Sequence, residues 1–447
     1  MLSLLTAMAT SQSSTHAVGR AFRWFGITLL GFATVLIGWS MLDRVLVDRS
    51  PIVVGILHSQ TGPIAVSERS MIDAEVLALE EINANGGILG RPVQWIIADG
   101  RSDWPTFADE AQRLIHEEKV CVLFGCWASA SRKSVLPVVE EADHLLVYPT
   151  FYEGIENSPQ VVYTGASPNQ QITPAVQWCH STLNARRFFL IGSDYIWPHC
   201  VNAIISDQLV GLDATKVEEA YVPFGGTDLQ PFIEDIKKSK PDVILCSVVG
   251  DSAIAFFKQL ALAGIDASQI PVVHFAIAED ELRSVDHTDM VGHYAACNYF
   301  QSIDNEQNRR FVSAFKSRYG SDRVTSDVIA TAYSSVKLWA NAVREAGSTD
   351  VHQVRNALRQ QSLDAPDGII AVDPETQHTW RPSFIAKIRQ DGQFNIVWSS
   401  GGPVRPVPYP ITRSRAVWTK FVEDLHSEWG GWSNTSVPSG LNAGGTQ

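Results

Sequence analysis

Residues 120–150 read VCVLFGCWASASRKSVLPVVEEADHLLVYPT: a short apolar run, a turn, an amphipathic stretch and a second apolar run. Short β-branched runs joined by helical stretches are typical of buried parallel strands with crossover helices. The same pattern recurs along the chain, with strands expected at 51–57, 93–99, 120–125, 144–150, 187–194, 218–223, 242–249 and 271–278. The unit repeats, is interrupted, and then repeats again. This arrangement predicts two doubly wound, Rossmann-like α/β lobes.

The stretches between the strands have helical periodicity. One expected helix face collects Phe107, Ala111, Leu114 and Ile115, and another collects Ile329, Tyr333, Val336, Ala340 and Val343. Asn85-Gly86-Gly87 and Gly264 are expected to end helices, because glycine adopts the positive φ that such ends require.

The composition restricts the class of protein. Apolar residues make up 45% and charged residues 19% of the 447 residues, as in globular proteins. The 35 Lys and Arg against 48 Asp and Glu give a formal net charge of −13. This charge repels phosphate backbones, so we expect no nucleic-acid partner.

Motifs for cofactors, metals and covalent catalysis do not occur in the sequence. It has no GxxxxGK[ST] loop, no GxGxxG after a strand, no GxSxG elbow and no HExxH. Its 12 histidines do not cluster at ligand spacing, and its six cysteines form no CxxC and are expected as buried free thiols. We therefore expect no cofactor, no metal and no enzymatic activity.

An uncharged run of 19 residues, WFGITLLGFATVLIGWSML, occupies 24–42. As a helix it would be roughly 28 Å long, about the thickness of a bilayer core. Arg20 and Arg23 precede it, so the positive-inside rule places a tail, 1–23, in the cytoplasm and the chain after it outside. The prediction is a transmembrane signal anchor holding a periplasmic, extracytoplasmic protein on the inner membrane. A cleaved signal peptide is the alternative.

Side chains suited to a small ligand follow several of the expected strands, and open α/β sheets bind ligands at the carboxyl ends of their strands. Ser129 is expected as a helix N-cap that leaves the N–H groups of Ala130 and Ser131 free for an anion or a carbonyl oxygen. The other candidates are aromatic or polar residues at strand ends, namely Trp127, Tyr148, Thr150, Tyr152, Tyr195, Trp197, Asp251 and Glu279. Each also has a structural interpretation as a helix cap, a packed aromatic or a solvated charge.

Several long segments resemble type I periplasmic substrate-binding proteins of the branched-chain amino-acid kind. The segments 78–93 (ALEEINANGGILGRPV) and 96–103 (IIADGRSD) are similar to the opening of those proteins. Within this group, further segments resemble the urea and short-chain amide branch. They are 125–154, 164–178, 188–198, 248–252, 276–282, 292–304, 322–333 and 391–408. The resemblance covers nearly all of the part expected outside the membrane.

The resemblance implies a two-lobed clamp with three hinge strands and a ligand held between the lobes. It places lobe 1 at 51–165 with 299–362 and lobe 2 at 166–298 with 363–410, with crossings near Ala166, Asn298 and Asp364. Carried over by motif, the ligand-binding residues are Trp127, Ser129, Tyr148, Thr150, Tyr152, Tyr195 and Trp197, followed by Asp251 and Glu279. Trp127 and Trp197 replace tyrosines of many family members, and would wall a pocket for roughly two to four heavy atoms.

The function predicted from these residues is binding of a small neutral amide, urea or a short aliphatic amide, as the receptor of an ABC-type transporter with permease partners. Ser129 and the helix-start N–H groups would serve the carbonyl oxygen, while Asp251, Glu279 or tyrosine oxygens would accept from NH₂ groups. One alternative is an amide-sensing regulatory protein that signals to a partner. Another, of a different class, is an amidase-like enzyme.

The chain ends in an extension, 411–447, that the repeating pattern does not include. Its last part, GGWSNTSVPSGLNAGGTQ (430–447), is rich in Gly and Ser. Such composition buries little apolar surface, so the extension is expected to lie over the protein surface and to be partly disordered.

Overall fold

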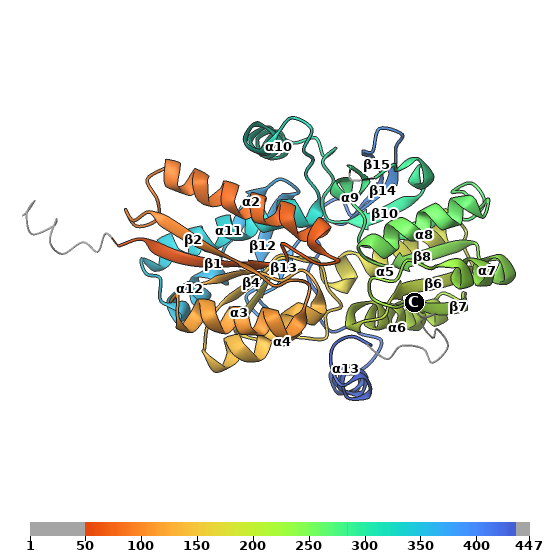
Figure 1. Cartoon of the computed structure of the whole chain (residues 1–447), viewed down its shortest axis with the longest axis horizontal. Coiled ribbons are helices and arrows are strands. Elements are labelled where there is room, and N and C mark those ends of the chain that lie inside the picture. Colours follow the sequence, from red (N-terminus) through yellow and green to blue (C-terminus); the bar gives the residue numbers. More distant parts are fainter. Residues whose placement is uncertain (1–49, 284, 435–447) are drawn as a thin grey trace, which may run out of the picture. The chain divides into compact units, whose positions relative to one another are not determined.

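The computed structural model describes residues 50–283 and 285–434 (Figure 1). The expected cytoplasmic tail and the apolar run at 24–42 lie outside these residues. Within the two described ranges, no helix combines the length and the apolar character that a membrane crossing requires.

The first lobe is built on a parallel sheet with the strand order β2-β1-β3-β4-β5. Its strands are β1 (Ile52–His58), β2 (Val93–Asp99), β3 (Leu123–Gly125), β4 (Leu146–Tyr148) and β5 (Val161–Tyr163). The connecting helices are α2 (Ala65–Ala84), α3 (Trp104–His116) and α4 (Ser129–Glu141). The four apolar runs expected as strands before residue 151 are therefore confirmed.

The second lobe is built on a sheet with the order β15-β14-β10-β9-β8-β6-β7, and Figure 1 shows the two sheets side by side. Five strands are parallel: β6 (Arg187–Ser193), β7 (Thr215–Val222), β8 (Val243–Ser247), β9 (Val272–His274) and β10 (Tyr294–Cys297). The antiparallel strands β14 (Phe384–Ile388) and β15 (Phe394–Ser399) complete the sheet. Its helices are α5 (Ile172–Thr182), α6 (Ile196–Gly211), α7 (Gln230–Ser239), α8 (Asp251–Leu262) and α9 (Glu279–Arg283).

After β10 the chain returns to the first lobe. It forms the helices α10 (Glu306–Tyr319), α11 (Asp327–Ala346) and α12 (Val351–Leu358), then the small antiparallel sheet β11 (Ser362–Ala365), β12 (Gly368–Val372) and β13 (Thr379–Trp380). Ala365, Ile370 and Val372 share a buried cluster with Val54 of β1, and His378 bridges Tyr163 of β5. The segment 362–380 therefore packs with the first lobe, so the last crossing follows β13 rather than lying near Asp364.

The expected helix faces are buried. Phe107, Ala111, Leu114 and Ile115 are the buried residues of α3, and α11 buries Ile329, Val336, Ala340 and Val343. Tyr333 of α11 is half-buried, and its hydroxyl donates to Glu81 on α2 at 2.6 Å. Helix α2 ends at Ala84, and Gly86 and Gly87 follow with φ of 90° and 79°, as expected for that turn.

The C-terminal extension contains a helix that the sequence analysis did not predict, α13 (Arg415–Trp429). The side chain of Ser414 caps it by accepting from the N–H of Val417 at 3.4 Å. Trp418 and Val422, one turn apart, are buried, and α13 packs on α6 of the second lobe (Figure 1). The Gly- and Ser-rich composition of 430–447 obscured this amphipathic stretch, which precedes it.

Candidate ligand-binding site

The predicted site residues lie at the carboxyl ends of strands in both lobes. Trp127 and Ser129 follow β3, and Tyr195 and Trp197 follow β6. These four side chains are enclosed, with exposed fractions of 3% for Trp127 and 2% for each of the other three. A ligand in contact with them would be shielded from solvent.

Four of the enclosed aromatic residues form a row across the two lobes, which we call the aromatic seam: Trp127, Phe151, Trp197 and Tyr195. The ring centroids of Trp127 and Phe151 are 6.2 Å apart, those of Phe151 and Trp197 5.3 Å, and those of Tyr195 and Trp197 6.3 Å. The indole Nε1 atoms of Trp127 and Trp197 are buried and have no hydrogen-bond partner among the described residues. Because buried polar groups are nearly always paired, these two N–H groups are candidate donors to a ligand oxygen.

The three remaining candidates of the first lobe, Tyr148, Thr150 and Tyr152, make contacts within that lobe. The Tyr148 hydroxyl donates to the Trp127 carbonyl oxygen at 2.9 Å, and the Thr150 hydroxyl donates to the Cys126 carbonyl at 3.3 Å. Tyr152 stacks on Tyr163, with centroids 5.1 Å apart, and its hydroxyl hydrogen-bonds the His378 ring. Tyr148 and Thr150 therefore position the loop that carries Trp127, whereas Tyr152 packs in the core.

The sequence predicts Ser129 as the N-cap of α4, and this prediction is wrong. Ser129 is the first residue of the helix. Ala128 takes the cap position in an extended conformation, with φ −72° and ψ 144°, and makes no side-chain cap bond. The Ser129 hydroxyl instead donates to the Glu153 carboxylate and accepts from Nη1 of Arg132 at 3.2 Å. The hydroxyl hydrogen of Ser129 is therefore already used in a hydrogen bond. The hydroxyl oxygen keeps one lone pair with which it can accept a hydrogen bond from a ligand.

A buried ionic cluster surrounds Ser129. Arg132 is fully buried, with Nη2 2.8 Å from Glu153 Oε1 and Nε 2.8 Å from Glu156 Oε1. Lys133 Nζ lies 3.0 Å from Glu156 Oε2. Burial alone would raise the pKa of Glu156, but the charges of Arg132 and Lys133 outweigh it and lower this pKa to about 2. Two cations and two carboxylates leave the cluster without net charge.

The two acidic candidates, Asp251 and Glu279, begin the helices α8 and α9 of the second lobe. Asp251 is exposed at the start of α8. Glu279 is fully buried, its Oε1 accepts from the Gln301 N–H at 2.7 Å, and burial raises its pKa well above the usual value. The interpretation of 279–281 as a solvated acidic run is wrong, because Asp280 and Glu281 are buried as well. Among the described residues, no hydrogen bond or ring contact joins Asp251 or Glu279 to the seam.

A second buried ionic group, not found from the sequence, closes the end of β1. The His58 ring lies between two carboxylates of α2, with Nδ1 3.1 Å from Glu68 Oε2 and Nε2 3.1 Å from Glu75 Oε1. Burial lowers the pKa of His58, but the charges and hydrogen bonds of Glu75 and Glu68 outweigh this and raise the pKa to about 10. The two carboxylates therefore favour the protonated, positively charged form of the ring.

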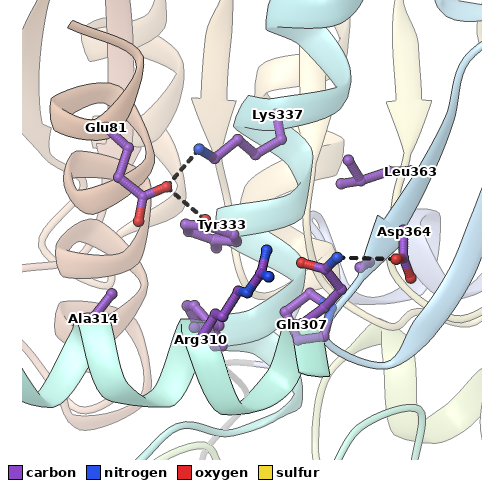
Figure 2. Close-up of a pocket in the computed structure, with 11 residues that line it drawn as sticks. Glu81, Gln307, Arg310, Ala314, Tyr333, Lys337, Leu363 and Asp364 are labelled. Atoms are coloured by element: carbon purple, nitrogen blue, oxygen red, sulfur yellow. Dashed lines mark hydrogen bonds and ion pairs between the residues drawn. The ribbon is translucent and has the colours of Figure 1, made fainter. Parts of the chain in front are cut away.

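One cavity outside the seam is lined by residues of α2, α10, α11 and β11 (Figure 2). It has a volume of about 410 Å³. The lining Arg310 bonds Glu306, one turn earlier on α10, and other polar groups of the lining pair with one another. Tyr333 and Lys337 both donate to Glu81, at 2.6 and 2.5 Å, and Gln307 donates to Asp364 at 3.0 Å. Because these partners satisfy each other, we place no ligand there.

Residues 52–415 match the family model described as a periplasmic binding protein domain. The chain belongs to this family. Among curated relatives, Leu/Ile/Val-binding protein homolog 7 of Brucella abortus (strain 2308) is 23% identical over 389 residues, covering 80% of this chain and 93% of the relative. A 143-residue match to the limonene hydroxylase of Geobacillus stearothermophilus is 35% identical and covers 31% of this chain but only 26% of that protein.

Solved structures share the fold of this periplasmic binding protein. A solute-binding protein of an ABC transporter from R. palustris, in complex with 4-hydroxybenzoate, has a TM-score of 0.72 and 20% identity, and covers 81% of this chain and 98% of the other. A leucine-binding protein from Thermotoga maritima MSB8 has a TM-score of 0.69 and 19% identity, with coverages of 78% and 98%. These likenesses establish the two-lobed architecture.

The two lobes of the binding protein touch beside α9. Ser67 of α2 donates to Glu281 Oε1 of α9 at 2.8 Å, and Arg283 Nε donates to the Asp322 carbonyl at 2.9 Å. These contacts and the aromatic seam join the two lobes in this structure. Among the described residues, no group of three or more His, Cys, Asp or Glu is placed to hold a metal ion.

Proposed function

We propose that the protein is an extracytoplasmic receptor that binds a small neutral amide, urea or a short aliphatic amide, at the aromatic seam and delivers it to an ABC-type permease. The family supports a binding role outside the cytoplasm, and the R. palustris neighbour is described as part of an ABC transporter. The anchoring helix at 24–42 stays a prediction from the sequence.

The observation that carries the choice of ligand is the internal neutrality of the ionic cluster. Arg132 and Lys133 are the cations next to Ser129, and both are already paired with Glu153 and Glu156. A ligand carboxylate buried here would lack a free counter-charge, and an unpaired buried charge is strongly unfavourable. A neutral ligand avoids this cost.

The free hydrogen-bonding groups match an amide, but Ser129 takes the opposite role to the one predicted from the sequence. It accepts from the ligand N–H instead of serving the carbonyl oxygen. The Ser129 hydroxyl donates its hydrogen bond to Glu153 and can accept one from a ligand NH₂ group. The indole N–H groups of Trp127 and Trp197 can donate to the carbonyl oxygen. An amide satisfies both sets of partners, and a buried group left without one would cost about 1–3 kcal/mol.

Calorimetry with a defined ligand panel tests this function. We expect urea, formamide or acetamide to bind, and N,N-dimethylacetamide to fail because it has no N–H for Ser129. Leucine, benzoate and 4-hydroxybenzoate represent the ligand classes named for the compared structures. Binding of one of these carboxylates and of no amide would refute the proposal.

The same closing clamp would also serve an amide sensor that reports occupancy to a partner. Uptake of labelled amide by cells with and without the gene separates the two roles. Loss of uptake on deletion supports the transport receptor, whereas unchanged uptake with a changed transcriptional response to the amide supports the sensor.

Trp127→Ala is expected to change which amide binds best. Removing the indole opens space beside Phe151 and deletes one free N–H donor. Urea and acetamide should therefore bind roughly fivefold to 150-fold more weakly, which corresponds to about 1–3 kcal/mol for a lost buried partner, while butyramide should gain relative to acetamide. Isothermal titration of the amide series measures this. An unchanged preference for amide length would make Trp127 an ordinary core residue.

A further inference from the structure

We propose that residues 430–434, which we call the C-terminal strap, latch the two lobes in the closed arrangement and slow release of the ligand. The strap follows α13 directly. Gly430 ends that helix with φ 67°, and the Gly431 N–H returns to the His426 carbonyl at 3.1 Å, which turns the chain toward the start of α6.

The strap is fixed to the second lobe. Arg413 reaches Asp207 of α6 with two hydrogen bonds of 2.8 and 2.7 Å, and α13 packs on the same helix. The Trp432 carbonyl accepts the Ile196 N–H at 3.1 Å, and Asn434 donates to Asp194 at 2.9 Å. Movement of the second lobe therefore carries the strap with it.

Two contacts join the strap to the first lobe. The Ser433 hydroxyl accepts from Nε1 of Trp104, on α3, at 2.9 Å. Lys133 Nζ, on α4, lies 4.9 Å from the ring centroid of Trp432, a cation–π contact. Because the strap moves with the second lobe, both contacts exist only while the lobes are closed.

The strap also lies directly against the candidate ligand site. Ser433 forms an antiparallel bridge with Tyr195 of the aromatic seam, and Trp432 caps the first turn of the helix that carries Trp197. Separation of the lobes at the seam therefore requires breaking the strap contacts to Trp104 and Lys133. A contact made only in the closed form lowers the open population and slows dissociation.

The first test measures closure without ligand. The paired variant Trp432→Ala/Ser433→Ala is compared with Ser427→Ala, whose exposed hydroxyl donates to the Glu423 carbonyl within α13 at 2.8 Å. By solution scattering, the ligand-free wild type and Ser427→Ala should give the same compact profile, and the paired variant a larger radius of gyration. Identical profiles for the wild type and the paired variant, compact or extended, would overturn the latch.

A double-mutant cycle isolates the Ser433–Trp104 bond. Trp104→Phe removes the N–H donor and keeps a ring against Phe224, whose centroid lies 5.5 Å from that of Trp104. Ser433→Ala and Trp104→Phe should each enlarge the radius of gyration, and the double variant should be no larger than either one. Fully additive effects would show that the two side chains act separately and would contradict the bond's role.

The second test measures release of acetamide by stopped-flow tryptophan fluorescence, and it rests on the proposed function. Loss of one hydrogen bond and one cation–π contact should speed release by roughly tenfold in the paired variant. A release rate equal to that of Ser427→Ala would overturn the effect on the ligand. If no amide binds but the scattering difference is present, the proposed ligand fails and the latch stands.

Discussion

Arg132→Met is expected to lower the free energy of unfolding by about 3–5 kcal/mol, the largest effect of any single change considered in this protein. Arg132 is fully buried, and its guanidinium bonds Glu153 and Glu156 at 2.8 Å each. Methionine keeps much of the side-chain volume but leaves the Glu153 carboxylate without its closest cation. Lys133 is 3.8 Å from that carboxylate and compensates only in part.

Guanidinium chloride unfolding measures this effect, since urea is itself a proposed ligand. The matched control is Arg309→Met, because Arg309 pairs with Asp304 while both are largely exposed, at 63% and 90%, and such pairs contribute little. Arg132→Met combined with Glu153→Gln should regain part of the loss, because the remaining Glu156 carboxylate still pairs with Lys133 Nζ at 3.0 Å. Equal effects of Arg132→Met and Arg309→Met would contradict a stabilising role for the cluster.

The second large effect is a pH dependence of stability that depends on His58. Its pKa is about 10 in the folded protein, above the usual value of 6.5. Between these values the folded state holds a proton that the unfolded state has lost, so stability falls as pH rises. The contribution is complete below about pH 6.5 and is lost through about pH 10, with a slope of at most about 1.4 kcal/mol per pH unit.

The measurement is the unfolding free energy of the wild type and of His58→Gln at several pH values from 6 to 10. Because other groups titrate in this range, the informative quantity is the difference between the two proteins, which should shrink as pH rises. His352→Gln is the control, since His352 is largely exposed beside Asp143. A difference that does not change with pH would show that His58 is not held as an imidazolium.

Local sequence patterns were sufficient for the framework and for the position of part of the site. The period of Phe107, Ala111, Leu114 and Ile115 identifies the buried face of α3, because neighbours at i+4 and i+7 share one side of a helix. The strand-end rule selected Trp127, Tyr195 and Trp197, three of the four members of the seam. Phe151 was missed, although it lies between Thr150 and Tyr152, because nothing local distinguishes a seam phenylalanine from a core one.

The sequence by itself determined the alternation of strands and helices and the strand ends at which a ligand is expected, because those depend on neighbours a few residues apart. Only the tertiary structure decided the chemistry of that region. Ser129 is left to act as an acceptor because its hydroxyl donates its hydrogen bond to Glu153, 24 residues away. Ser433 reaches Trp104 across 329 residues of chain. Such partners are determined by how the lobes and α13 pack. Pairs this far apart in the chain follow no periodic spacing, so a sequence pattern cannot predict them.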